Sequence, residues 1–237
     1  MFMVKLAKKI INPLGVDIMG YPHRLVQNRI RLMNLHDISV VFDIGASTGQ
    51  YVNEIRKAGY QGKIVSFEPL KRAFLSLKKS SEKDDKWQIL NMAVGNTIGE
   101  LEINVSANLV SSSFRNISNL CLDNAPGTRY VNKEKVKMIT LDSVIDKHKL
   151  HDDSLFVKID VQGFEKEVIE GALNSIDKIT GFQLELSLFQ VYEGSLLFKE
   201  MLDLLNQYGF SLMSLEPGFS DRKTGKLLEA DGIFFRN

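Results

Sequence analysis

The sequence VVFDIGASTGQY, residues 40–51, decides how the chain folds. Three apolar residues lead into Asp43, and two glycines, Gly45 and Gly49, precede an amphipathic segment. Glycine has no Cβ, so it lets the backbone turn sharply and lets a ligand approach the main chain. The stretch therefore predicts a buried strand, a ligand-binding turn and a helix, in that order.

The spacing of these glycines separates two classes of nucleotide-binding loop. The dinucleotide fingerprint G-x-G-x-x-G, begun at Gly45, needs glycine at positions 47 and 50, but the chain has Ser47 and Gln50. The observed pattern D-x-G-x-x-x-G instead resembles the first motif of class I S-adenosylmethionine-dependent methyltransferases, whose cofactor has no pyrophosphate. A strand-to-helix turn that Asp43 and the glycines merely shape is the structural alternative.

An acidic residue ends the next apolar run. Residues 63–67 read as a second strand, Glu68 follows it, and Pro69 cannot continue a sheet ladder. Glu68 lies 19 residues beyond Gly49, where α/β nucleotide binders commonly place a carboxylate that accepts hydrogen bonds from the ribose hydroxyls. The spacing supports a cofactor site built on the ends of two strands.

The rest of the chain alternates strand and helix patterns, which is typical of an α/β fold. An apolar strand over 155–159 is followed by Asp160 and Gly163, so it repeats the order of strand, carboxylate and glycine. Glu185 lies near the end of a later strand. The other expected strands cover 87–94, 101–105, 136–139, 182–186, 210–215 and 232–235, and the expected helices cover 22–35, 50–58, 73–77, 141–145, 196–208 and a segment from about 164.

Residues 107–129 show little periodicity and include three consecutive serines. A connection longer than about 15 residues inside a compact domain is usually functional or mobile. We therefore read this segment as a loop on the acceptor side of the site. A disordered surface excursion is the equally open alternative.

Composition fits one globular domain. The chain has 237 residues, of which 44% are hydrophobic and 25% charged, and α/β sheets often reach this length undivided. We expect a single domain over 1–237, with an N-terminal helical extension over 1–38 and the core over 39–237. A formal charge of +1 gives no overall field that would attract nucleic acid. The single cysteine, Cys121, excludes an internal disulfide and suits a reducing compartment, so we expect a cytoplasmic protein.

The N-terminal residues show the pattern of an amphipathic helix. Phe2, Leu6 and Ile10 can share one helical face that is flanked by lysines, which leaves weak attachment to an anionic membrane surface open. Packing of this face on the protein's own core is the favoured alternative. No segment approaches the ~18 apolar residues of a membrane span, and the opening residues lack the apolar core and cleavage site of a signal peptide.

Five motifs, taken in order, make the chain resemble the FkbM family of S-adenosylmethionine-dependent methyltransferases. The block VKIDVQGFEKEVIEGA at 157–172 is the most specific of them. The resemblance covers roughly residues 40–235. The other motifs are VFDIGASTGQY at 41–51, SFEP at 66–69, NMAVG at 91–95 and ITLDSV at 139–144.

The resemblance implies a three-layer, Rossmann-like class I methyltransferase fold, with a seven-stranded sheet of six parallel strands and an antiparallel last strand. It also implies S-adenosylmethionine as cofactor and methylation of a hydroxyl on a sugar, glycan or natural product. By analogy with the family, the first loop lines the methionine end, Glu68 binds the ribose, and the third strand lies near the adenine. The expected cofactor-binding residues are Asp43, Gly45, Ser47, Gly49, Tyr51, Glu68, Pro69, Asn91, Ala93 and Val94.

Methyl transfer to a hydroxyl needs an acceptor oxygen held behind the methyl carbon, and a base can assist by taking the hydroxyl proton. Asp160 is the first candidate because its strand ends in the expected cleft, Glu185 is the second, and Lys158 either orients a carboxylate or is structural. The two carboxylates can also hold Mg²⁺ or Mn²⁺, which would polarise the hydroxyl. The family pattern has glutamate before Gly163, where this chain has Gln162, so the position lacks the charge that a base or metal ligand needs.

Two other functions compete with this reading. A nicotinamide-dependent oxidoreductase would use the same sheet, but the missing glycines weigh against it. A non-catalytic cofactor-binding or scaffold protein would keep the same loop, and Gln162 is the residue that favours it. The four histidines lack the paired spacing of a zinc site.

Overall fold

The structure of the protein is a computed structural model that describes residues 24–149 and 152–237. Most of the expected N-terminal extension, with its lysine-flanked apolar face, lies outside the described residues. Among the residues that are described, no helix is long and apolar enough to span a membrane. The helix expected to begin near Pro22 is α2, Arg24–Leu35, and its apolar residues at helical spacing are buried, namely Ile30, Leu32 and Met33.

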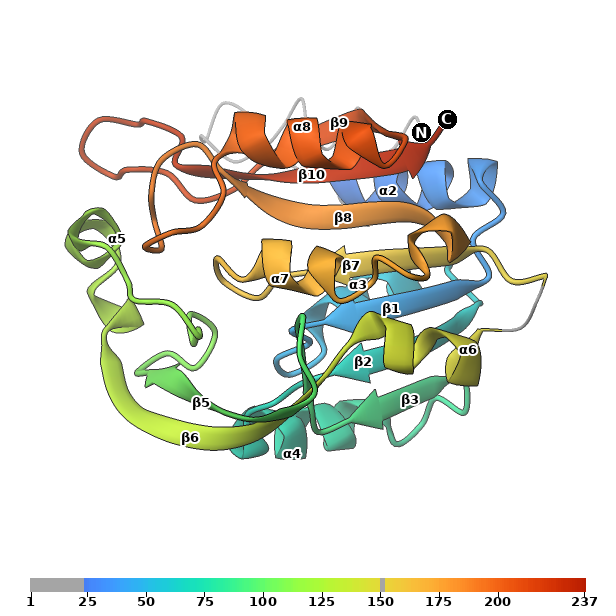
Figure 1. The fold of residues 1–237 in the computed structure, drawn as a ribbon, viewed down its shortest axis with the longest axis horizontal. Helices are drawn as coiled ribbons and strands as arrows, with labels where there is room; N and C mark the ends of the chain where they lie inside the picture. The colour runs from blue at the N-terminus through green and yellow to red at the C-terminus, as the bar shows by residue number, and fades with distance from the viewer. Residues whose placement is uncertain (1–23, 150–151) are drawn as a thin grey trace, which may run out of the picture.

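Seven strands form the central sheet in the order β3-β2-β1-β7-β8-β10-β9 (Figure 1). β1, β2, β3, β7 and β8 pair parallel, whereas β10 pairs antiparallel with both β8 and β9. β9 therefore runs with the parallel strands and β10 is the reversed strand, which confirms the expected fold class. The strands are β1 Val40–Ile44, β2 Lys63–Phe67, β3 Trp87–Leu90, β7 Leu155–Ile159, β8 Ile179–Ser187, β9 Phe210–Pro217 and β10 Glu229–Arg236.

Helices cover both faces of this sheet. Figure 1 shows α7 and α8 on one face and α2 and α3 on the other. Side chains alternate along β1, so Phe42 joins the core beneath α7 and α8, and Val41 joins the core beneath α2 and α3. The helices are α3 Gln50–Lys57, α4 Lys71–Ser81, α6 Ile145–His148, α7 Glu165–Glu170 and α8 Phe198–Gln207.

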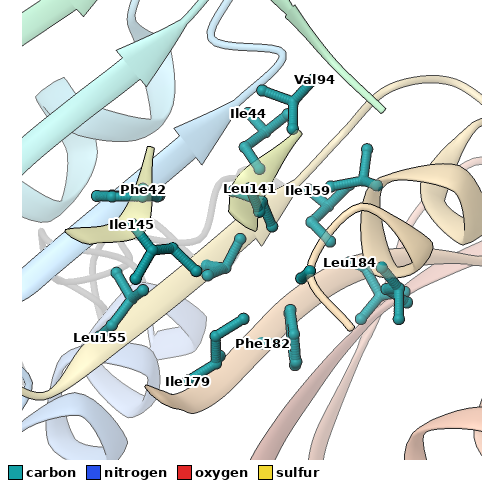
Figure 2. Packing of buried hydrophobic residues seen from close by; sticks show 14 of the residues in the cluster. Phe42, Ile44, Val94, Leu141, Ile145, Leu155, Ile159, Ile179, Phe182 and Leu184 are labelled. Carbon is teal, nitrogen blue, oxygen red and sulfur yellow. The ribbon is translucent and has the colours of Figure 1, made fainter. Parts of the chain in front are cut away.

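The larger core lies between the sheet and α6, α7 and α8. Phe42, Leu155 and Phe182 are fully buried in it, beside Ile145 from α6 (Figure 2). Full burial of a side chain of this size contributes roughly 1.5–3 kcal/mol. β1 and β7 are apolar runs buried along their whole length, as is usual for parallel strands covered by helices on both faces. Because these strands and their neighbours β2 and β8 pair parallel, their carboxyl ends lie at one edge of the sheet.

A smaller sheet, in the order β4-β6-β5, lies beside those carboxyl ends (Figure 1). The expected strand over 87–94 divides, because β3 joins the central sheet while β4, Ala93–Val94, pairs with β6. β5, Gly99–Ser106, pairs antiparallel with β6, Tyr130–Ile139. β6 begins earlier than the sequence predicts. Most of its first half is exposed and carries no apolar pattern, so the sequence does not indicate a strand there.

The 107–129 segment has more structure than the sequence predicts. It contains α5, Asn119–Asn124, and a 3-10 turn over Pro126–Thr128. The side chain of Ser118 caps α5 by accepting a hydrogen bond from Cys121 N. Elements this short give no measurable periodicity, so the sequence alone reads as a loop.

Candidate active site

The loop between β1 and α3 is held by the backbone of its neighbours. Gly45 N and Ala46 N both donate to Phe67 O, at 3.0 Å each. Gly45 has φ +76°, and a Cβ at this position would lie 1.9 Å from Asp160 O. Only glycine fits this crossing, because a side chain would push the ends of β1 and β7 apart. The loop therefore joins the ends of β1, β2 and β7.

Glu68 follows β2, and both of its carboxylate oxygens are fixed. Its Oε2 accepts from Ser47 N and its Oε1 accepts from Leu70 N, at 2.8 Å each. Each oxygen keeps a further lone pair, so the carboxylate can still accept two hydrogen bonds from a diol such as a ribose. Burial raises the pKa of Glu68 to about 7, and the two N–H donors oppose that rise.

A mostly apolar cavity opens beside Glu68. Asp160 lines the cavity, and Val110 and Phe114 enclose it from the 107–129 segment. Six predicted cofactor-binding residues also line it, namely Gly45, Ser47, Glu68, Pro69, Ala93 and Val94.

Three other predicted cofactor-binding residues do not line this cavity. Asp43 is fully buried beneath the loop, where its Oδ2 accepts from Ser66 Oγ at 3.1 Å. A Cβ on Gly49 would lie 2.6 Å from Trp87, so glycine lets α3 pack against β3. Asn91 is exposed, and its amide donates to two backbone carbonyls of the β2–α4 turn, at 2.9 Å each.

A second cavity lies on the other side of the glycine loop and shares Gly45, Ser47 and Asp160 with the first. Two predicted residues, Tyr51 and Lys158, line it. Its lining also includes residues that were not predicted from the sequence, among them Arg29, Gln183 and Asp231. The two cavities together follow the ends of β2, β1, β7 and β8.

Three buried polar atoms of the second cavity have no hydrogen-bond partner within the described ranges: Tyr51 Oη, Gln183 Oε1 and Arg29 Nε. Their residues are 8%, 3% and 6% exposed, respectively. A buried polar atom without a partner costs about 1–3 kcal/mol, so three of them in one cavity fit a polar ligand. The donors Tyr51 Oη and Arg29 Nε suit a carboxylate, whereas Gln183 Oε1 beside Asp231 suits an ammonium group.

Arg29 and Gln183 each stand out from the apolar pattern of the residues around them. Arg29 is a basic residue inside the buried stripe of α2, and its Nη2 lies 2.7 Å from Glu216 Oε2. In β8 the polar residues at 183, 185 and 187 alternate with buried apolar residues at 182, 184 and 186. Polar residues at every second position of a buried strand form a polar row on one face of the sheet.

Lys158 lies close to the carboxylates of Asp43 and Asp160. Its Nζ is 3.1 Å from Asp43 Oδ1 and 3.5 Å from Asp160 Oδ2, and it donates to Gly45 O at 3.3 Å. Burial opposes the charge of Lys158, but Asp43 and Asp160 outweigh that effect and raise its pKa. A lysine held in this way stays protonated, which suits it to orient Asp160 and not to exchange a proton.

One side-chain amide joins the two predicted catalytic carboxylates. Gln162 Nε2 donates to Asp160 Oδ1 at 2.8 Å and to Glu185 Oε2 at 3.2 Å, while Gln162 Oε1 accepts from Tyr192 Oη. A divalent cation, which the sequence leaves open, is not supported, because these N–H groups lie between the carboxylates. In the part of the chain that the structure describes, no group of three or more His, Cys, Asp or Glu side chains is arranged to hold a metal ion.

A third cavity lies beyond this amide. Burial, followed by the charges of Glu229 and Asp160, raises the pKa of Glu185, and burial raises the pKa of Glu229 to about 8. The lining of the third cavity, as far as the structure describes it, includes no lysine or arginine. Such a cavity suits an uncharged molecule with hydroxyl groups better than an anion. Its polar lining comes from Asn108, Ser111, Thr128, Gln162, Glu185, Tyr192 and Glu229.

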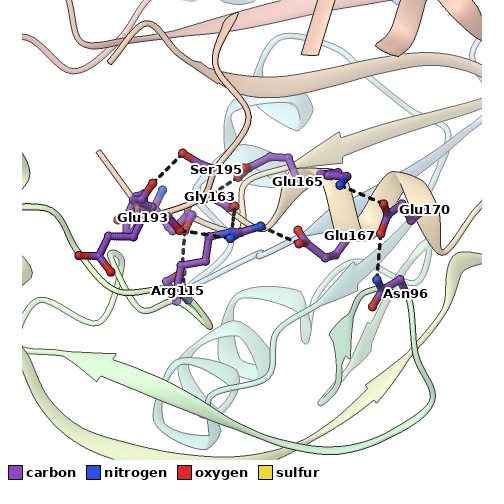
Figure 3. Close-up of polar contacts among 12 residues, drawn as sticks. Asn96, Arg115, Gly163, Glu165, Glu167, Glu170, Glu193 and Ser195 are labelled. Carbon is purple, nitrogen blue, oxygen red and sulfur yellow. Dashed lines mark hydrogen bonds and ion pairs between the residues drawn. The ribbon is translucent and has the colours of Figure 1, made fainter. Parts of the chain in front are cut away.

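Arg115 fixes the 107–129 segment to the turn between β7 and α7 (Figure 3). Its guanidinium donates to Gly163 O, to Glu193 O at 3.2 Å and to Glu167 Oε1 at 2.6 Å. The segment contributes lining residues to both the first and the third cavity. An anchored segment between two cavities favours the acceptor-side reading over a disordered excursion.

Comparison with known proteins gives a match that spans this site. Residues 43–212 match the family described as the Methyltransferase FkbM domain. The chain is also 25% identical, over 176 residues, to the 2-O-methyltransferase NoeI of Sinorhizobium fredii, and the alignment covers 71% of this chain and 72% of that protein. All residues that the sequence predicts for the site lie inside the family match, whereas Arg29, Glu229 and Asp231 lie outside it.

Solved structures share the fold at low identity. A putative S-adenosylmethionine-dependent methyltransferase from Listeria monocytogenes is 7% identical with a TM-score of 0.50, over 90% of this chain and 98% of that one. The FkbM methyltransferase from Methylobacillus flagellatus KT is 14% identical with a TM-score of 0.46, over 83% of this chain. The chain spans 44% of the length of that second protein, which is less than half.

Proposed function

The chain belongs to the FkbM methyltransferase domain family, and from this membership we propose that it transfers a methyl group from S-adenosylmethionine to a hydroxyl oxygen of a sugar, glycan or natural product. One observation carries the proposal. The buried carboxylate of Glu68, fixed by Ser47 N and Leu70 N, lines the same cavity as Asp160. A diol-binding carboxylate and a candidate base therefore share one cavity.

Two groups of residues would hold the cofactor at its polar ends. Glu68 accepts hydrogen bonds from the ribose hydroxyls. The unpaired donors Arg29 Nε and Tyr51 Oη suit the methionine carboxylate, and the unpaired acceptor Gln183 Oε1 suits the ammonium group. Bound in this way, the cofactor supplies a methyl carbon attached to a positively charged sulfur.

Asp160 is the proposed general base. Its side chain is 39% exposed at the boundary of the first two cavities. Lys158 Nζ, at 3.5 Å, and Gln162 Nε2, at 2.8 Å, hold its two oxygens in different directions. Asp160 takes the proton of the acceptor hydroxyl as the new O–C bond forms and the C–S bond to the methyl group breaks, so that the electron pair leaves with the sulfur of the demethylated cofactor; general-base assistance of this kind typically contributes 10²–10⁴-fold to the rate.

The acceptor would enter through the third cavity, next to Gln162 and Glu185. Hydroxyl, amide and carboxyl groups line that cavity, and such groups exchange hydrogen bonds with the hydroxyls of a sugar. The name of the relative in Sinorhizobium fredii, a 2-O-methyltransferase, supports oxygen as the atom that receives the methyl group. The nature of the acceptor is part of the same proposal.

A non-catalytic cofactor-binding protein is the second candidate function, and Gln162 is the observation that favours it. An amide cannot serve as a base or as an anionic metal ligand. Asp160 nevertheless keeps a partly exposed carboxylate beside the amide. A nicotinamide-dependent oxidoreductase is weaker, since Ser47 and Gln50 replace two glycines of the dinucleotide fingerprint.

Two measurements test the proposed function. Titration calorimetry should give saturable binding of S-adenosylmethionine and of its demethylated product, and NADH should not compete with either. A tritium-labelled methyl donor should then label neutral sugars in a panel that also contains amino sugars and uronic acids. Binding of the cofactor with no transfer to any hydroxylated acceptor would favour the non-catalytic function, and competition by NADH would overturn the cofactor assignment.

A further inference from the structure

We propose that Gln162 is a positioning residue whose amide bridges Asp160 and Glu185 in the place that a divalent cation would take, so that methyl transfer in this chain needs no metal ion. The inference rests on the proposed function and goes beyond it, because it assigns a role to the residue at which the chain departs from its family pattern. Three features of the structure carry it: the hydrogen bonds of the amide, the way its backbone is held, and the charges around it.

The hydrogen bonds use the whole carboxamide. A primary amide has two N–H hydrogens and one carbonyl oxygen. The hydrogens go to Asp160 Oδ1, at 2.8 Å, and to Glu185 Oε2, at 3.2 Å, and the oxygen accepts from Tyr192 Oη. The group therefore orients two carboxyls and one phenol at once, which is what a cation with oxygen ligands would do at this position.

The backbone of Gln162 is held in a conformation that few non-glycine residues adopt. Its φ is +56°, and Gly163 follows at +92°. Ser113 Oγ donates to Gln162 O at 2.7 Å. A Cβ on Gly163 would lie 2.5 Å from Tyr192 Cβ, so the turn packs directly on the tyrosine. A strained, well-anchored turn persists only when its surroundings require it, and here it aims the amide between the two carboxyls.

The charges around the bridge explain why a donor is required there. Glu185 is half-buried, and loss of solvent followed by the charges of Glu229, Asp160 and Glu165 raises its pKa. Lys158 contacts the other oxygen of Asp160 and does not contact Glu185. The N–H groups of Gln162 thus supply positive electrostatic potential between the carboxyls without adding a net charge.

The substitution Gln162→Glu is the sharpest test, because it replaces the two N–H donors by a carboxylate of nearly the same shape. Three carboxylates would then meet at one point, an arrangement that favours a divalent cation with oxygen ligands. Binding of Mn²⁺ to the full chain, measured by calorimetry without acceptor, is the readout. The matched control is Gln207→Glu, which adds the same charge at an exposed position at the end of α8.

We expect wild type and Gln207→Glu to show equally weak, non-saturable Mn²⁺ binding, and Gln162→Glu to bind at least tenfold more tightly, which corresponds to about 1.4 kcal/mol. The added change Asp160→Asn should remove the gained affinity. In the transfer assay EDTA should leave wild type unchanged, and Mn²⁺ should raise the activity of Gln162→Glu alone. Saturable Mn²⁺ binding by wild type, or inhibition of wild type by EDTA, would overturn the proposal.

A further variant covers the case in which Gln162→Glu does not fold. Gln162→Asn keeps an amide and tolerates the left-handed backbone, but its side chain is one methylene too short to bridge the carboxyls. Its turnover should fall at unchanged cofactor affinity, and no cation should restore it. Wild-type turnover in this variant would overturn the bridging role. Cofactor binding, measured separately, reports on the proposed function, so failure of one claim is distinguishable from failure of the other.

Discussion

Glu68 and Glu185 both carry carboxyls near the ends of strands in the central sheet, but Glu68 is buried and Glu185 is half-buried, and their partners differ in kind. Glu68 accepts hydrogen bonds from Ser47 N and Leu70 N, which belong to the loops on either side of it. Glu185 has a side-chain amide as its partner and other carboxyls as its neighbours. The first wall of the site therefore holds its carboxylate on backbone N–H groups, whereas in the second wall loss of solvent and the neighbouring carboxyls raise the pKa of Glu185.

The difference separates binding from reaction. The wall around Glu68 has satisfied donors and spare acceptor capacity, which suits tight binding of a diol. The wall around Asp160, Gln162 and Glu185 brings two carboxyls together on one side-chain amide, which suits proton transfer. If this division is correct, substitutions in the first wall change cofactor affinity, and substitutions in the second change turnover.

The largest effect is expected for Asp160→Asn. The variant keeps the shape and part of the hydrogen bonding but removes the charge that accepts the proton. Turnover should fall roughly 10²–10⁴-fold while cofactor affinity stays nearly constant. Steady-state kinetics and calorimetry on the same preparation measure both, with the exposed Asp203→Asn in α8 as the matched control. Parental turnover would make Asp160 structural and leave Glu185 as the next candidate base.

A smaller loss, in affinity and not in turnover, is expected for Glu68→Ala. The variant loses charge-assisted hydrogen bonds worth about 1.5–3 kcal/mol, which is roughly 10- to 150-fold in cofactor affinity. Because the ionised form accepts the ribose hydroxyls and the pKa of Glu68 is about 7, wild-type affinity should rise between about pH 6 and pH 8. Calorimetry across that range tests the assignment. Equal affinity and an equal pH slope in the folded variant would remove Glu68 from the site.

Tyr51→Phe should move stability and affinity in opposite directions. The free protein gains about 1 kcal/mol of unfolding free energy, because the variant removes a buried hydroxyl that lacks a partner among the described residues. Cofactor affinity falls about fivefold, because the same hydroxyl no longer donates to the methionine carboxylate. Thermal unfolding with and without cofactor measures both. A loss of stability in the free protein would show that the hydroxyl already has a partner.

The smallest expected effect concerns how the 107–129 segment is attached. Arg115→Ala removes the contacts with Gly163 O and Glu167, so the segment should open more often and be cleaved faster by a protease, roughly tenfold for each 1.4 kcal/mol of local stability lost. Cofactor and acceptor together should slow cleavage of wild type. The exposed Arg72→Ala in α4 is the control. Identical cleavage of wild type, Arg115→Ala and Arg72→Ala would show that Arg115 does not anchor the segment at the site.

Features that depend on neighbouring residues could be predicted from the sequence. The strand segments, the glycine loop and Glu68 followed from runs of neighbouring residues, because they depend on local turns and on the apolar pattern of each strand, whereas the arrangement of the sheet was implied by the family resemblance. The position of Asp160 followed from the same rule at the end of β7. The role of Asp43 was harder to read, because its burial beneath the loop depends on Ser66 and Lys158 from two other strands.

Residues that meet through the tertiary fold escaped the sequence reading. Arg29 reaches the second cavity from α2, and Asp231 reaches it from β10, so chain segments far apart define that site. The bridge from Gln162 to Glu185 also joins different strands, and a sequence pattern shows the substituted glutamine but not what it contacts. The split of the 87–94 run between two sheets was missed because the run contains no glycine or proline that would mark a break between strands.

The central claim is that this chain methylates a hydroxyl with S-adenosylmethionine, and transfer of a labelled methyl group tests it most directly. Purified protein would be given tritium-labelled S-adenosylmethionine with a set of neutral glycan acceptors and with the same glycans after their hydroxyls have been blocked. We predict label on a free hydroxyl of one acceptor, no label on its blocked counterpart, and loss of labelling in Asp160→Asn. Saturable cofactor binding with no labelling of any free hydroxyl, or equal labelling of the blocked glycans, would contradict the account.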